Sequence, residues 1–176
     1  MAKCIAVIGA LDTKGDEFWF VKKEIENRGY NALVINVGIV DGPGFEPEVG
    51  AEKVAGAAGS SLEILKAKAD RGLAIETMTR GIGQIMGDLY SAGRIQAVIS
   101  MGGSAGTEIG TAGMRALPLG LPKVMVSTLA SGDTKPYVGT RDIVMVPSIV
   151  DVAGVNRISA RVYAGAVGAV IGMLET

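Results

Sequence analysis

The residues from 96 to 114, QAVISMGGSAGTEIGTAGM, constrain the fold more than any other stretch of this chain. The apolar run at 97–101 has the composition of a strand buried on both faces. The run stops at Gly102-Gly103, and apolar residues then recur at helical spacing, so a helix is expected to begin near Ser104. A buried strand, a glycine-rich turn and a helix N-terminus in succession predict an anion site, because the free amide groups and the dipole of the first helical turn favour negative charge.

This stretch supplies the first candidate binding residues, which are Gly102, Gly103, Ser104, Gly106 and Thr107. Glycine lets a ligand come close to the backbone, and the two hydroxyl groups add donors. The pattern is not a Walker A loop, because no lysine follows the last glycine, and it has only one of the three glycines of the dinucleotide-binding fingerprint in register. Taken alone, the stretch fits a plain tight turn with Ser104 as N-cap equally well.

Strands and helices alternate along the whole chain. Strands are expected at 3–9, 32–37, 97–101, 123–127 and 143–146, and helices at 16–28, 48–58, 62–92, 104–117 and 156–174. The crossover from the second to the third strand is long enough to carry the chain back past the first strand. This predicts an α/β fold with a doubly wound, five-stranded parallel sheet of order 2-1-3-4-5, a Rossmann-like or flavodoxin-like three-layer sandwich formed by a single domain over residues 1–176.

In a sheet of this order, ligands bind where the strand order reverses, beyond the carboxyl ends of the first and third strands. The loop after the first strand carries Asp12, Thr13 and Lys14. Lys14 is a candidate for a charge contact to a phosphate, and Asp12 for holding Mg²⁺ through water. The alternatives are an exposed lysine at a helix start and an N-cap for the first helix. Because both loops lie at the switch point, the topology favours the anion site over the plain turn.

A second polar loop follows the fourth strand. It contains Thr128, Ser131, Gly132 and Asp133. These residues are candidates for contacts to a ribose or a phosphate, and the alternative is that they cap a short turn.

Composition excludes several classes of function. The chain has no histidine, so a Ser-His-Asp triad, a Cys-His dyad and a histidine-based zinc site are impossible within it, and no protein metal centre is predicted. A net charge of −1 gives no electrostatic case for nucleic acid or an anionic membrane. The most apolar run, 162–174, is shorter than a membrane span, and the first residues lack a signal-peptide pattern, so a cytoplasmic location is expected.

Four segments in the same order resemble one family. They are AVIGALDTKGDEF at the start, MGGSAGT in the middle, MVSTLASGD after the fourth strand and SIVDVAGVNRIS near the end. The chain is similar in them to the family of the plant tomato mosaic virus resistance protein and its bacterial and fungal relatives, whose N-terminal region is described as ATP-binding. The resemblance implies ATP as the ligand and, since members usually continue for another domain, a second domain or a companion chain beside this one.

Three functions remain open at this point. The first is a nucleotide-binding domain for ATP, with Mg²⁺ as a further candidate cofactor. The second is an enzyme, or part of one, acting on a phosphorylated or carboxylated small molecule, with a carboxylate and a lysine in the cleft. The third is an oligomerisation module with a vestigial site, in which the glycine-rich helices form the interfaces of a homo-oligomer.

Overall fold

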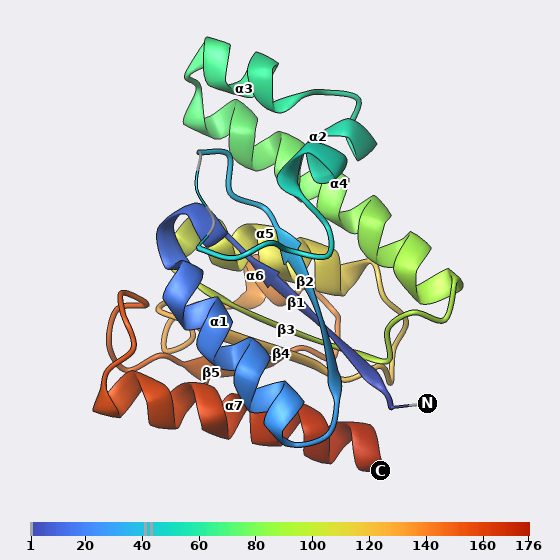
Figure 1. Cartoon of the computed structure of the whole chain (residues 1–176), viewed down its shortest axis with the longest axis vertical. Helices are drawn as coiled ribbons and strands as arrows, with labels where there is room; N and C mark the ends of the chain where they lie inside the picture. The colour runs from blue at the N-terminus through green and yellow to red at the C-terminus, as the bar shows by residue number, and fades with distance from the viewer. Residues whose placement is uncertain (1, 41, 43) are drawn as a thin grey trace.

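A sheet of five parallel strands forms the centre of the computed structural model, which describes residues 2–40, 42 and 44–176 (Figure 1). The strands are β1 (Cys4–Gly9), β2 (Asn31–Asn36), β3 (Ala97–Gly102), β4 (Lys123–Ser127) and β5 (Val144–Pro147). The helices are α1 (Leu11–Asn27), α2 (Ala51–Ala57), α3 (Leu62–Lys68), α4 (Arg71–Ser91), α5 (Ser104–Arg115), α6 (Lys135–Val138) and α7 (Arg157–Glu175). The strand order is β2-β1-β3-β4-β5, which confirms the predicted topology.

Helices cover both faces of this sheet and make two separate apolar layers. Side chains alternate between the faces along a strand, so Ile5 and Val7 of β1 pack toward α1 and α7, whereas Ala6 and Ile8 pack toward α2, α4 and α5. Figure 1 shows α1 and α7 side by side on one face, and α3 standing away from the sheet beyond α2 and α4. The fold is therefore the three-layer α/β sandwich that the alternation of elements predicted.

The helices differ from the prediction in three places. The predicted helix over 62–92 is two helices, because Ala69 adopts a left-handed conformation (φ 49°) and Asp70 caps α4 by accepting a hydrogen bond from the Leu73 amide. The first helix starts at Leu11 rather than Asp16, with a kink at Lys14 (φ −137°, ψ 33°). Residues 135–138, expected to be loop, form the short helix α6.

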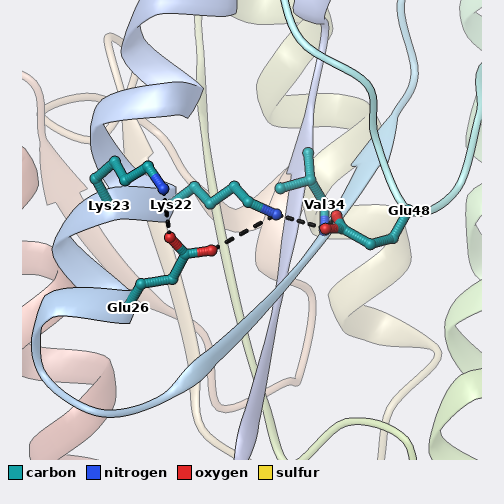
Figure 2. Close-up of polar contacts among 5 residues, drawn as sticks. All are labelled: Lys22, Lys23, Glu26, Val34 and Glu48. Atoms are coloured by element: carbon teal, nitrogen blue, oxygen red, sulfur yellow. Dashed lines mark hydrogen bonds and ion pairs between the residues drawn. The ribbon is translucent and has the colours of Figure 1, made fainter.

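The outer edge of β2 is closed by the segment that follows it. The Val49 amide donates to the Val34 carbonyl at 3.0 Å, and the Val49 carbonyl accepts from the Asn36 amide at 2.9 Å. Glu48 completes the closure, because its Oε2 accepts from the Val34 amide at 2.7 Å while Lys22 pairs with its other oxygen (Figure 2). These contacts occupy backbone groups that an edge strand otherwise leaves open to another chain.

Acid is expected to weaken this closure. Burial alone would raise the pKa of Glu48, but the hydrogen bonds from Lys22 and from the Val34 amide outweigh it and hold the pKa below its ordinary value. A carboxylate whose folded-state pKa is depressed stabilises the fold above its unfolded-state pKa of about 4.3 and loses that contribution as pH falls through the lower, folded-state value. In urea unfolding, the stability difference between the wild-type protein and Glu48→Gln should therefore shrink from pH 7 to pH 3.

Glu76→Gln is the control for this series, because Glu76 is an exposed carboxylate on α4. It should leave the pH dependence of unfolding close to that of the wild-type protein. A Glu48→Gln difference that stays constant over the same pH range would contradict the stabilising role of the Glu48 charge.

Helix α7 is long and apolar enough to cross a membrane by length and composition, with a mean hydropathy of 1.3 over its most apolar window. In the structure one face of this helix packs against the sheet, and 39 % of that window is buried. Tyr163, Val167 and Val170 are completely buried in the layer between α7 and the sheet. The cytoplasmic location expected from the sequence stays a prediction.

Candidate functional site

The N-terminus of α5 lies at the carboxyl edge of the sheet, next to the reversal of strand order between β1 and β3. Gly103 is its N-cap residue, and within the described residues no side chain caps the helix. Ser104, the first helical residue, is exposed, so it is not the N-cap that the turn interpretation required. The Thr107 amide donates to the Gly103 carbonyl at 2.8 Å. The amide groups before Thr107 are those that a helix leaves without an internal acceptor.

Two glycines at this point have different structural roles. A Cβ atom on Gly102 would lie 2.8 Å from the Cα of Gly106, so the end of β3 and the first turn of α5 touch through their backbones. At Gly103 a Cβ would meet only the Oγ1 of Thr128, at 3.8 Å. Gly102 is therefore needed for packing, whereas the absence of a side chain at Gly103 keeps the space between α5 and the loop after β4 open.

Thr107 connects α5 to the sheet. It is fully buried, and its hydroxyl lies 2.6 Å from the Ser127 hydroxyl at the end of β4. The Ser127 Oγ also accepts from the Leu129 amide at 3.0 Å. These contacts align the loops after β3 and β4, and they direct the Thr107 hydroxyl inward.

The N-terminal part of α1 is acidic on its open side. Asp12 accepts from the Val40 amide at 3.1 Å through Oδ2, and its Oδ1 is buried with no partner among the described residues. The N-cap of α1 is Ala10, so Asp12 is not the N-cap that the alternative interpretation required. A cavity of about 290 Å³ beside the exposed Thr13 has Asp12, Asp16 and Glu17 in its wall.

Lys14 and Glu17 hold the loop between β5 and α7. The Lys14 ammonium donates to the Val152 carbonyl, and the Glu17 carboxylate, 3 % exposed, accepts from the Gly154 amide. Burial raises the pKa of Tyr163, which lies beneath this loop, and the Glu17 carboxylate raises it further, so the phenol stays protonated at neutral pH. Lys14 is therefore engaged with the protein rather than turned outward.

A second cavity, of about 540 Å³, lies beyond the carboxyl ends of β4 and β5. Thr128 and Ser131, both predicted from the sequence, line it. Gly132 is exposed close by, and Asp133 accepts from the Lys135 amide at 3.1 Å just before Thr134, the N-cap residue of α6.

Residues of the β5–α7 loop complete the wall of this cavity, and the predicted site did not include them. They are Ser148, Ile149, Val150 and Asp151. The signal for them was positional, because they follow the last strand and must therefore meet the loop after β4 at the same edge. Ile149 is 75 % exposed in a left-handed conformation (φ 67°), which is rare for a β-branched residue.

Comparison with known proteins finds one family and several relatives. Residues 3–176 match the family described as "Uncharacterised protein family (UPF0261) N-terminal domain". The chain is 48 % identical to a UPF0261 protein of Clostridium tetani over 175 residues, 99 % of this chain and 43 % of that protein. It is 43 % identical to a UPF0261 protein of Mesorhizobium japonicum over 171 residues, 97 % of this chain and 42 % of that protein.

The match to a plant protein covers a smaller share of both chains. The ToMV resistance protein Tm-1 of Solanum lycopersicum is 42 % identical over 110 residues, 60 % of this chain and 15 % of that protein. The chain spans less than half the length of the curated relatives that it matches.

Proposed function

This chain belongs to the uncharacterised protein family UPF0261, as its N-terminal domain, and we propose that it binds the phosphate groups of a nucleotide, ATP in the first place, at the N-terminus of α5. The resemblance to the tomato protein and its bacterial relatives is confirmed as family membership. ATP binding goes beyond that membership. Since the relatives extend well past the matched part, we also propose that the domain works together with the rest of a longer chain.

One observation carries the proposal: the uncapped N-terminus of α5 at the switch point of a doubly wound sheet. Its first amide groups point along the helix axis toward the carboxyl edge, and the helix dipole adds a partial positive charge there. Gly103 brings no side chain between these amides and a ligand. The described residues at this end thus offer backbone N–H donors, which can bind phosphate oxygens without the help of a lysine.

Mg²⁺ enters the proposal together with the nucleotide. No group of three or more acidic, cysteine or histidine side chains able to hold a metal ion occurs within the described part of the chain. A magnesium ion that keeps several waters and is bound mainly by phosphates does not need such a group.

A thermal-shift titration with ATP, ADP and AMP, each with and without Mg²⁺, tests the proposal. A ligand that binds only the folded state at 100 times its Kd adds about 2.7 kcal/mol to stability, which raises Tm by several degrees in a domain of this size. The expected result is a shift that grows with the number of phosphates. The same Tm with and without millimolar ATP and Mg²⁺ would overturn the proposal.

Ser104→Pro should remove one amide donor and keep the fold. Proline is well tolerated at the first position of a helix, and Gly103 (φ −81°, ψ −152°) lies outside the α region that a following proline disfavours. Losing one hydrogen bond to a charged group should raise the Kd for ATP about tenfold. Isothermal titration calorimetry gives the Kd, and circular dichroism checks that α5 and the fold remain.

Ser104→Ala is the matched control, because it removes the hydroxyl and keeps the amide. Its Kd should stay much closer to that of the wild-type protein. Equal affinities of Ser104→Pro and Ser104→Ala for ATP would contradict an amide-based site at α5.

A further inference from the structure

We infer that the nucleotide extends from α5 toward β4 and β5, and that the 2′ and 3′ hydroxyls of its ribose lie in the cavity beyond these strands, where Asp151 accepts their hydrogen bonds. This inference rests on the proposed phosphate site at α5. It assigns a ligand-binding role to the β5–α7 loop and a direction to the ligand.

Thr128, a residue of the cavity wall, lies next to the N-terminal end of α5. The wall contains Ser127, Thr128, Ser131, Ser148, Ile149 and Asp151, around a volume of about 540 Å³. The Thr128 amide donates to the Gly102 carbonyl at 3.2 Å, and the Thr128 hydroxyl would lie 3.8 Å from a Cβ on Gly103. A ligand with its phosphate on the α5 amides therefore meets Thr128 first and the rest of the cavity beyond it.

Some polar side chains of the cavity wall are already hydrogen-bonded within the protein, and others are available to bind a ligand. The Ser127 and Ser148 hydroxyls are engaged within the protein, Ser127 with Thr107 and Ser148 with the Val150 carbonyl at 2.6 Å. The side chains of Thr128, Ser131 and Asp151 make no hydrogen bond to any other residue that the structure describes.

Two hydroxyl donor-acceptors and one carboxylate are thus available at one cavity. A carboxylate accepts from two neighbouring hydroxyl groups at once, and charge-assisted bonds of this kind are the strong ones. That chemistry fits the diol of a ribose. It does not fit a further phosphate, because the Asp151 carboxylate repels it.

The opposite direction, toward β1, is unfavourable for a polyphosphate. The cavity on that side has three carboxylates in its wall, from Asp12, Asp16 and Glu17. The ammonium group of Lys14, in the same part of α1, donates to the Val152 carbonyl and does not face this cavity as a free charge. Phosphates placed there would be repelled by these carboxylates. On the β4 side they remain hydrogen-bonded to the α5 amides and lie beside hydroxyl groups.

The β5–α7 loop is held in position before any ligand binds. Contacts from Ser148, Lys14 and Glu17 fix it on both sides of Ile149 and Asp151. Within that frame Ile149 keeps a left-handed conformation (φ 67°) and a largely exposed side chain. An exposed isoleucine beside the available carboxylate offers the apolar contact that one face of a sugar ring requires.

The test compares three probes on the full chain by isothermal titration calorimetry: inorganic tripolyphosphate, ATP and 2′,3′-dideoxy-ATP. The wild-type protein should bind ATP at least about tenfold more tightly than dideoxy-ATP, since charged acceptors make strong hydrogen bonds. In Asp151→Asn this preference should fall to a few-fold or less, while tripolyphosphate binds as in the wild-type protein. Asp88→Asn is the control, an exposed carboxylate on α4 outside the candidate site, and should retain the preference.

The outcomes separate this inference from the proposed function. Tripolyphosphate and ATP binding with no penalty for dideoxy-ATP would overturn the ribose assignment and leave the phosphate site standing. A dideoxy penalty that persists in Asp151→Asn would overturn it as well. Absence of binding by both tripolyphosphate and ATP would overturn the phosphate site, and the ribose assignment with it.

Discussion

Gly81→Ala is expected to lower the free energy of unfolding by about 3 kcal/mol, the upper end of the usual cost of overpacking. A Cβ on Gly81 would lie 1.9 Å from the carbonyl oxygen of Val54, and this atom belongs to the backbone of α2. A flexible side chain would move aside, but a helix backbone moves only if α2 and α4 separate. That separation would open the apolar layer that both helices form on the sheet. Urea unfolding at neutral pH measures the loss.

Gly83→Ala is a matched control on the same helix, because a Cβ on Gly83 meets nothing within 4 Å. Alanine is a better helix former than glycine by roughly 1 kcal/mol, so this variant should be as stable as the wild-type protein or slightly more so. A Gly81→Ala protein as stable as Gly83→Ala would contradict the close α2–α4 contact.

Asp142→Asn is expected to lower the free energy of unfolding by about 2 kcal/mol, less than breaking a fully buried ion pair costs, because the Asp142 side chain is 40 % exposed and water screens the pair. Lys123, at the start of β4, has a completely buried side chain, and its ammonium donates to Asp142 at 2.8 Å and to the carbonyls of Pro118 and Leu121. Asparagine keeps an acceptor for the Gly120 amide, which Asp142 also binds, but it removes the negative charge. The Lys123 charge would then be buried without a counter-ion, and denaturant unfolding should report the loss.

The double variant Lys123→Met/Asp142→Asn tests the reason for that loss. It removes both charges and replaces the buried ammonium with an apolar chain of similar length, so it should be more stable than Asp142→Asn alone. A double variant less stable than Asp142→Asn would show that the carbonyl contacts of Lys123 matter more than its charge.

Sequence patterns predicted the sheet well because a strand buried on both faces is a short apolar run with clear limits. The predicted strand at 123–127 coincides with β4, and the long crossover correctly implied that β3 lies beside β1. The predicted last helix over 156–174 is also present as α7, and its N-cap Asn156 accepts from the amides of Ile158 and Ser159.

Local details set by tertiary contacts were harder to predict. The apolar spacing of 62–92 continues across Ala69, so the pattern hides the break between α3 and α4. The kink in α1 occurs at Lys14, whose side chain donates to the carbonyl of Val152, a residue far along the chain. The local signals for these features are weak ones, Asp70 as a preferred N-cap residue and Gly15 next to the kink.

The candidate site shows the same limit. Residue types located the α5 N-terminus, but they did not show that the Thr107 hydroxyl is occupied by Ser127 or that Lys14 is engaged with the protein. Asp133 accepts a hydrogen bond from the Lys135 amide, whereas Asp151, after β5, lies in the wall of the cavity with its carboxylate unpaired within the described residues. The two carboxylates look alike in the sequence, and only the packing of the loops distinguishes them.

The closure of β2 by residues 48–49 has a consequence for assembly. At the other end of the sheet, β5 has half-exposed apolar residues, with Val144 40 % exposed, and it pairs only with β4 in the described structure. A sheet that can accept a strand at one edge alone can join a second copy across a two-fold axis, but the pair then has no receptive edge left. The sheet is thereby protected against growth into fibrils, while a dimer through β5 remains compatible with the homo-oligomer predicted from the sequence.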